Sequence, residues 1–401
     1  MRATIRLILR DPTLRLMAFC AAVLGCWAGS VGPYASLIAV EVFGISNAAY
    51  AAVLVAALAI SVGASVWIGI LTDQHPHRRA MALTASLTTL AAGGIVLIWP
   101  GQLAFVLSHT LLMPLAGTIM GQFFAVARLK SQTLDPDQRD SVTALIRTCI
   151  AIPFVVVLPL WGVLAENGGS LLAIYGGVTG FGLILTAAVW RYWPADDRAP
   201  WVEVKSGIGF RASLAEMAKG PVFLRVQLFG MLHVGGAMIG IITGLVFAQA
   251  GRGTDQVGLF FAIFVAFEVA SIVLIAPLRR HFRRLTLITV GVLTYAAAIA
   301  LLPLWVDSAL VWLLVIPAGV GGGLIYNLAV GYLQDLLGAR PGAGASLLVL
   351  QRIATDSFAA AAFWIGTLIS GYGLAAALAA ACMALAMAAI LALDRVRVAA
   401  A

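Results

Sequence analysis

Long apolar runs alternate with short polar stretches along almost the whole chain. Each run is close to or longer than the ~20 residues that an α-helix needs to cross a bilayer. The runs are Leu16 to Val40, Ala48 to Leu71, Ala80 to Trp99, Leu103 to Ala127, Ser141 to Ala165, Ser170 to Tyr192, Val222 to Ala250, Val257 to Pro277, Leu285 to Trp305, Ala309 to Leu336, Ala345 to Ser370 and Leu374 to Leu393. The pattern predicts an all-α integral membrane protein with twelve transmembrane helices.

One polar interval divides these runs into two sets of six. The stretch from Trp193 to Gly220 carries eight charged residues and no apolar run of membrane length. Such parity is typical of transporters built from two repeated bundles. We therefore expect a bundle at residues 1–192, a connector at 193–220 and a second bundle at 221–401. Within the connector, apolar residues at helical spacing fit either a helix on the membrane surface or a solvated turn.

Composition agrees with a membrane protein, since 62% of the 401 residues are hydrophobic and only 10% are charged. The net charge of +8 comes from arginines and lysines in short loops. Nearly all of them fall in the loops on the side of the N-terminus, and Arg252 is the exception on the other side. The positive-inside rule then predicts that both termini and the connector are cytoplasmic. No basic tract with interleaved aromatic residues is present, so nucleic-acid binding is not expected.

Four charged residues lie inside the predicted spans, namely Arg147, Glu268, Arg352 and Asp356. A charge in the bilayer is costly unless it is paired or solvated, so these residues are candidates for transport. Helix geometry places them at similar depth, with Asp356 one turn beyond Arg352 on the same helix face. They could neutralise each other around a water-filled cavity. Alternatively, Arg352 and Asp356 form a fixed pair within one helix that has no role in transport.

Several uncharged polar residues accompany these four. Gln122, Tyr326 and Asn327 could form a polar rim for a hydroxylated substrate, because each desolvated hydroxyl needs a partner. His109 and His233 could carry a proton, although a lone histidine in a helix is more often a hydrogen-bonded packing residue.

Other features of the spans suggest packing or membrane anchoring. The glycines of the tenth span, Gly319, Gly321, Gly322 and Gly323, indicate close helix packing or a bend. Two groups of aromatic residues are expected at the membrane surfaces, Trp99, Trp305 and Tyr372 on one side and Trp190, Tyr192 and Trp193 on the other.

The chain lacks the motifs of the common enzyme classes. It has no nucleotide-binding loop, no GxSxG and no HExxH. The four cysteines all fall in apolar spans, and no Cys/His cluster suggests a metal. We expect no cofactor, so uphill transport must draw on an ion gradient. A protonatable Glu268 or Asp356 facing a basic partner is a suitable device for proton coupling.

The loop after the second span contains Asp73 followed by Arg78 and Arg79. It resembles the loop motif of the major facilitator superfamily, in which the acid and the arginines latch the two halves on the cytoplasmic side. The second-half loop at residues 276–284 keeps the basic cluster but has no acid. In the alternative interpretation these arginines are only topology signals.

Further motifs are similar to those of the sugar efflux transporter (SET) family of bacteria. GQFFAVAR at residues 121–128 looks like its PQLFALAR-type segment, and Arg147 with Pro159 looks like its helix-five arginine and proline. Glu268 matches a helix-eight glutamate, and Gln334-Asp335-Leu336-Leu337 followed by Arg340 resembles its helix-ten motif. The resemblance implies proton-coupled export of saccharides from the inner membrane, with Asp335 and Arg340 in the cytoplasmic gate.

Three functions follow from these observations. The first is proton-coupled efflux of sugars or small glycoside-like compounds by alternating access, with protons and membrane lipids as the other partners of a monomer. The second is export of drugs or other small amphiphiles. The third is a membrane receptor that transports nothing, which would not need buried ionisable residues.

Overall fold

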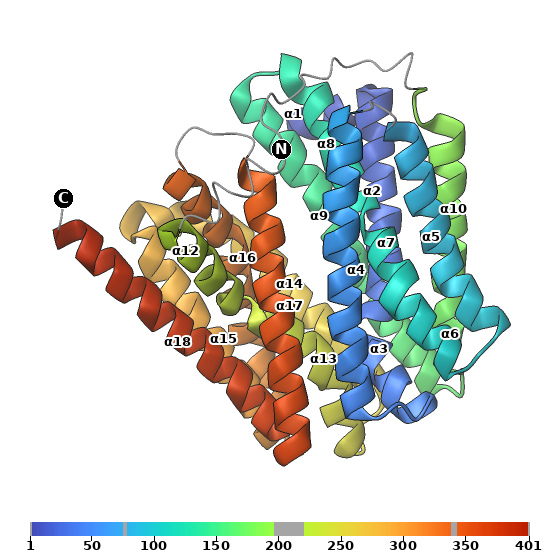
Figure 1. Ribbon diagram of the computed structural model, residues 1–401, viewed down its shortest axis with the longest axis vertical. Helices are drawn as coiled ribbons and strands as arrows, with labels where there is room; N and C mark the ends of the chain where they lie inside the picture. The colour runs from blue at the N-terminus through green and yellow to red at the C-terminus, as the bar shows by residue number, and fades with distance from the viewer. Residues whose placement is uncertain (1, 75–77, 196–219, 338–342, 400–401) are drawn as a thin grey trace. The chain divides into compact units, whose positions relative to one another are not determined.

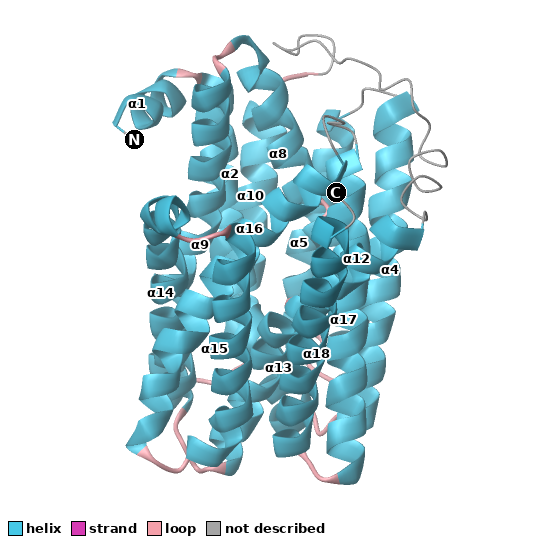
Figure 2. Ribbon diagram, turned by 90° about the vertical axis from the view of Figure 1, so that its left-hand side faces the viewer, coloured by secondary structure: helices cyan, strands magenta, loops and turns pink. Residues whose placement is uncertain are grey.

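The computed structural model describes residues 2–74, 78–195, 220–337 and 343–399, which form helices joined by short loops (Figure 1). No strand occurs in these ranges, as Figure 2 shows. The chain divides into two compact units. The first unit is Met1–Gly44 with Ala56–Gly207, and the second is Ile45–Val55 with Ile208–Ala401. The predicted surface helix of the connector lies outside the described residues.

The first unit is built around α2, which packs against α8, α9 and α10, while α5 packs against α10. Its elements are α1 (Arg2–Arg10), α2 (Pro12–Val31), η1 (Gly32–Tyr34), α3 (Ala35–Leu37), η2 (Ile38–Val42), most of α4 (Asn47–Gln74), α5 (Arg78–Ile98), α6 (Gln102–Leu107), η3 (Ser108–Leu112), α7 (Met113–Gly117), α8 (Ile119–Lys130), η4 (Ser131–Thr133), α9 (Pro136–Glu166) and α10 (Ala173–Tyr192). The short helix α1 precedes the first apolar span and was not predicted.

In the second unit, α14 and α15 pack against α16. Helices α12, α15 and α17 pack against α18, and α12 also packs against α17. Its elements are α12 (Gly220–Leu232), α13 (Val234–Gln249), α14 (Thr254–His281), α15 (Arg284–Trp305), η6 (Ala309–Leu314), α16 (Val315–Leu337), α17 (Ala343–Ile369) and α18 (Tyr372–Ala399). The start of α4 is also part of this unit, where Asn47 Oδ1 accepts a hydrogen bond of 3.1 Å from the Tyr372 hydroxyl.

The helices match the predicted apolar runs. Eleven helical spans in the described residues are long and apolar enough to cross a membrane. The remaining predicted run, Ala345 to Ser370, corresponds to α17, which ends at Ile369. The predicted all-α membrane class is therefore confirmed, whereas the cytoplasmic location of the termini stays a prediction.

Tight turns end several spans through glycine. Gly251 has φ 68°, and the next amide, that of Arg252, donates to the carbonyl of Phe247 at 2.9 Å. This is the bonding pattern of a Schellman motif, in which a left-handed residue satisfies the last helix carbonyls. Gly371 has φ 109°, and its own amide donates to the Gly366 carbonyl at 2.7 Å. Such turns keep consecutive spans adjacent and antiparallel.

Two of the predicted aromatic anchors are not at a surface. Trp193 is 3% exposed and Tyr372 is 7% exposed, so neither belongs to an interfacial belt. Trp193 packs against the ring of Phe123, and Tyr372 packs against Phe363. Trp99, Trp190 and Tyr192 are exposed as expected for residues at a membrane interface.

Glycines let α16 approach α14 and α15 at backbone distance. A Cβ added at Gly319 would lie 2.6 Å from the carbonyl oxygen of Phe264, and one at Gly321 would lie 2.7 Å from that of Gly291. A Cβ at Gly323 would overlap the Ser271 hydroxyl and lie 2.7 Å from the carbonyl oxygen of Glu268. The predicted close packing is confirmed for these three. A Cβ at Gly322 would meet nothing closer than 3.7 Å.

We predict that Gly323→Ala lowers the thermal stability of the purified protein, whereas Gly322→Ala does not. Both substitutions raise helix propensity by the same amount, so the difference between their unfolding temperatures reports the overlap with α14 alone. Overpacking of this kind costs about 1–3 kcal/mol. Thermal unfolding in detergent, followed by tryptophan fluorescence, measures the effect. Equal unfolding temperatures for the two variants would contradict the glycine-mediated contact.

Candidate functional site

Glu268 lies near the middle of α14, on the side of the helix that faces α16. Its backbone is in contact with Gly319 and Gly323, and its carbonyl oxygen accepts a hydrogen bond of 2.7 Å from the Ser271 hydroxyl. The side chain is half-buried. Among the described residues, none donates a hydrogen bond to its carboxylate or forms an ion pair with it. An intramembrane carboxylate without a fixed partner is able to take up and release a proton.

Two tyrosines and an asparagine adjoin Glu268. The Tyr326 hydroxyl lies directly against Gly236, where a Cβ would collide with it, and it interacts electrostatically with Glu268. Tyr295 is 1% exposed, and its hydroxyl has no hydrogen-bond partner in the described residues. Asn327 is exposed, and its Nδ2 donates to the Gly323 carbonyl at 2.7 Å. The amide of Asn327 is thereby held on α16 while its oxygen stays available.

The seventh span is interrupted at His233, between α12 and α13. His233 Nδ1 lies 2.8 Å from the Phe229 carbonyl, and Gln351 Nε2 lies 3.1 Å from His233 Nε2. These contacts fit a neutral imidazole that donates from Nδ1 and accepts at Nε2. His233 is 4% exposed, so the ring is a buried, hydrogen-bonded residue at the break. Interrupted spans are a recurrent feature of transporter binding sites.

Residues that were not predicted hold this break in place. The Thr355 hydroxyl donates to the Gly230 carbonyl at 2.8 Å, and a Cβ at Gly230 would lie 2.5 Å from the Gln351 carbonyl oxygen. Helices α12 and α17 are therefore packed at backbone distance here. The Oε1 atom of Gln351 is buried and has no hydrogen-bond partner among the described residues. A signal was present in the sequence, since Gln351 and Thr355 are spaced by one helical turn and each precedes a charged residue.

The charged residues Arg352 and Asp356 occupy the neighbouring face of α17. Arg352 Nε donates to Asp356 Oδ2 at 3.2 Å, so the two residues form the pair within one helix that was the alternative interpretation of these charges. The side chains are 65% and 32% exposed. Both groups also interact electrostatically with the Tyr326 hydroxyl. The second unit thus gathers Glu268, Tyr326 and the pair on α17 into one polar group next to the break at His233.

The candidate residues of the first unit fall at two separate places. Arg147 on α9 is exposed, and its guanidinium carbon lies 5.4 Å from the centre of the Phe124 ring. This is a cation–π contact. Gln122 is buried, and its Oε1 accepts a hydrogen bond of 3.3 Å from Arg78 Nη1 at the start of α5. Gln122 is therefore placed with the residues of the predicted gate.

The rest of the predicted gate is only partly described. Arg79 Nη2 donates to the Trp190 carbonyl at 2.9 Å, which ties the start of α5 to the end of α10. Asp73 lies on α4 and Asp335 on α16, but their side chains are outside the described part of the structure, as is the whole of Arg340. The latch between acid and arginine stays a prediction.

His109 is a packing residue in the first unit. It lies in the π-helical turn η3, where its ring stacks on Phe105 at 4.0 Å between ring centres. Its Nε2 lies 2.8 Å from the Tyr175 hydroxyl. Throughout the described residues, no group of three or more His, Cys, Asp or Glu side chains could hold a metal ion.

Comparisons with known proteins agree with this architecture. Two similar solved structures are crystal structures of the nucleoside transporter NupG and of a single-residue mutant of it. The first has a TM-score of 0.77 and covers 95% of this chain and 98% of NupG; the mutant has a TM-score of 0.76 and covers 95% and 99%. Sequence identity is 12% in both cases, so the likeness concerns the fold. A search of curated proteins finds no match.

The sequence itself matches a family profile over most of its length. The profile described as Major Facilitator Superfamily matches residues 17–352, from within α2 to Arg352 on α17. Members of this family are multi-pass membrane carriers of small molecules. The chain belongs to the Major Facilitator Superfamily.

Proposed function

We propose that this protein is a secondary active transporter that exports sugars or small glycoside-like compounds in exchange for protons by alternating access. The observation that carries the proposal is the half-buried Glu268 carboxylate, which has no fixed partner in the described residues and lies beside Tyr326. Retaining such a group inside a membrane bundle is costly, and proton binding gives it a function.

Proton exchange at Glu268 would couple to the substrate through the neighbouring polar groups. A neutral, protonated Glu268 can donate a hydrogen bond, whereas the ionised form repels the Asp356 carboxylate and attracts the guanidinium of Arg352. Arg352 is 65% exposed, so its side chain has room to change partner. Uptake of a proton at Glu268 would therefore alter the charge that a bound solute meets.

The side chains around Glu268 favour a hydroxylated solute over a purely apolar one. Tyr326 and Asn327 offer a hydroxyl and an amide oxygen, and Arg352 offers several N–H donors. The Tyr326 ring is 40% exposed and adds an aromatic surface, which the buried His233 ring supports edge-on at 4.8 Å between ring centres. A sugar or glycoside carries both hydroxyls and a flat apolar face. The nucleoside transporter NupG, whose fold is similar, is by its name a carrier of such a glycoside.

The remaining parts of the proposal concern the first unit and the location. Arg147 is proposed as a substrate or proton-coupling residue, held over the Phe124 ring. Asp73, Arg78, Arg79, Asp335 and Arg340 are proposed as the cytoplasmic gate. The excess of arginine in the loops on one side supports a bacterial inner-membrane location with cytoplasmic termini. Export of drugs or other amphiphiles is the alternative that the substrate panel below tests.

We predict that Glu268→Gln reduces substrate-evoked proton movement to background and leaves substrate binding measurable. Glutamine keeps the size and polarity of the side chain but cannot exchange a proton. The assay uses proteoliposomes with an internal pH dye and a panel of sugars, glycosides and cationic drugs. Asp255→Asn is the matched control, because Asp255 lies in the first turn of the same helix. Unchanged proton-driven transport by Glu268→Gln would refute the assignment.

A second prediction separates hydroxylated substrates from drugs. Tyr326→Phe should weaken the apparent affinity for sugars and glycosides about 2- to 12-fold, the loss expected for one hydrogen bond. Affinity for cationic drugs should not change. Tyr295→Phe removes the same atom from a residue that is 1% exposed and serves as the control. Equal effects of Tyr326→Phe on sugars and drugs, or none on either, would count against the substrate class.

A further inference from the structure

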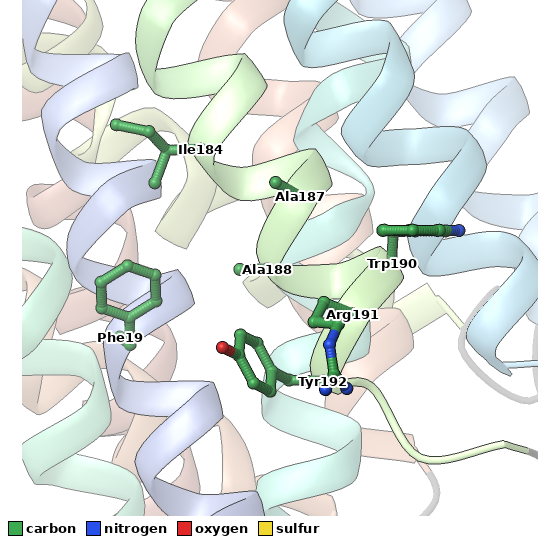
Figure 3. A pocket seen from close by; sticks show the side chains of 7 residues that line it. All are labelled: Phe19, Ile184, Ala187, Ala188, Trp190, Arg191 and Tyr192. Atoms are coloured by element: carbon green, nitrogen blue, oxygen red, sulfur yellow. The ribbon is translucent and has the colours of Figure 1, made fainter.

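A hollow of about 470 Å³ lies on the surface of the first unit between α2 and α10. Figure 3 shows Phe19 of α2 on one side and Ile184, Ala188 and Tyr192 of α10 on the other. Ala187, Trp190 and Arg191 complete the lining. The hollow is open and mostly apolar, so in a membrane a lipid acyl chain would occupy it.

The walls of the hollow keep large apolar groups exposed. Phe19 is 48% exposed and Ile184 is 46% exposed, which is typical of a helix surface in contact with lipid. The short side chains of Ala187 and Ala188 leave the space between Phe19 and Ile184 unfilled, which makes the surface hollow there. Trp190 and Tyr192, at 64% and 66%, mark the level at which aromatic residues meet the headgroups.

One arginine lines this hollow, and a second, Arg15, lies one helical turn from the lining residue Phe19. Arg191 belongs to its lining and lies over the Tyr192 ring at 5.3 Å. Arg15 precedes Phe19 by four residues on α2, so it lies on the same face, about 6 Å nearer the helix start. Because α10 ends where α2 begins, both cations are at one end of the hollow. The Arg79 contact with the Trp190 carbonyl fixes the end of α10 in this position.

The described residues leave both arginines without a carboxylate partner. Arg15 is exposed, and its Nη1 donates only a long bond of 3.4 Å to the Leu9 carbonyl. The nearby acid, Asp11, is engaged elsewhere. Its Oδ1 caps α2 by accepting from the amides of Thr13 and Leu14, and its Oδ2 pairs with Lys130 at 3.2 Å. A diester phosphate would supply the missing negative charge.

We propose that this hollow is a binding site for an anionic phospholipid. One acyl chain lies between Phe19 and Ile184, and the phosphate lies between Arg15 and Arg191 at the level of Trp190 and Tyr192. A zwitterionic lipid of the same chain length fits the apolar part equally well but brings a cationic group to the arginines. The site therefore selects for headgroup charge, with about a fivefold contribution to affinity from each arginine.

The test measures lipid retention by native mass spectrometry and the unfolding temperature of the full chain in detergent. The probes are phosphatidylglycerol, phosphatidylcholine with the same acyl chains, and free glycerol phosphate. The variant Arg15→Gln with Arg191→Gln removes the charges, and Ala187→Trp fills the hollow while keeping them. The pair Arg280→Gln and Arg283→Gln is the control, since it removes the same charge from exposed residues of the second unit.

The proposal predicts that wild type and the control pair retain phosphatidylglycerol in preference to phosphatidylcholine and unfold at higher temperature with it. The double arginine variant should lose about 25-fold in this preference. Ala187→Trp should lose retention of both lipids. Equal retention of the two lipids by wild type, or unchanged preference in the double variant, would overturn the proposal. Stabilisation by glycerol phosphate alone would also overturn it and indicate a site for soluble phosphate.

Discussion

The second unit depends on one contact, the backbone packing of α16 against α14 through Gly319 and Gly323. Lipid supplies no hydrophobic force between helices, so close approach of backbones is what associates them. Here that approach occurs where α14 carries Glu268. The same glycine face therefore fixes the carboxylate in depth and orients Tyr326 and Asn327, which follow on α16. Packing and the proposed chemistry are coupled, because a wider spacing at Gly323 would also move the Glu268 carboxylate, which we propose exchanges a proton.

The break at His233 also depends on polar contacts inside the membrane. Interrupting a helix frees backbone groups that lipid cannot satisfy. The His233 amide donates to the Gly230 carbonyl at 3.0 Å, so the Phe229 carbonyl loses its usual helix partner and accepts from the His233 ring instead. Thr355 gives the Gly230 carbonyl a second donor. One face of α17 is thus used to stabilise the break. The adjoining face carries the exposed Arg352 and the half-buried Asp356. One face of α17 therefore has a structural role, and the other is available to a solute.

The sequence was sufficient for the helices, because hydrophobic length is a local property. It also singled out the four intramembrane charges, since their cost is local, but their role in transport stays a prediction. It was not sufficient for residues whose role depends on what they meet. Gln122 and Asn327 are both uncharged polar residues within apolar spans, yet Gln122 is buried and bonded to Arg78. Trp193 and Trp190 both lie at the end of the same span and were predicted to anchor it at the membrane surface, yet Trp193 is 3% exposed. Gln351 was missed because an uncharged polar residue in a span is common and its partner lies 118 positions away.

Arg252 illustrates why charge counts need structural context. It is the one basic residue in the predicted loops on the side opposite the N-terminus. Its guanidinium donates to the carbonyls of Val306 and Ser308 and to Gln256 Oε1, and it lies over the Phe247 ring. These contacts join the loop after α13 to the loop after α15. An arginine used in this way acts as a structural tie, so this exception does not weaken the charge asymmetry of the remaining loops.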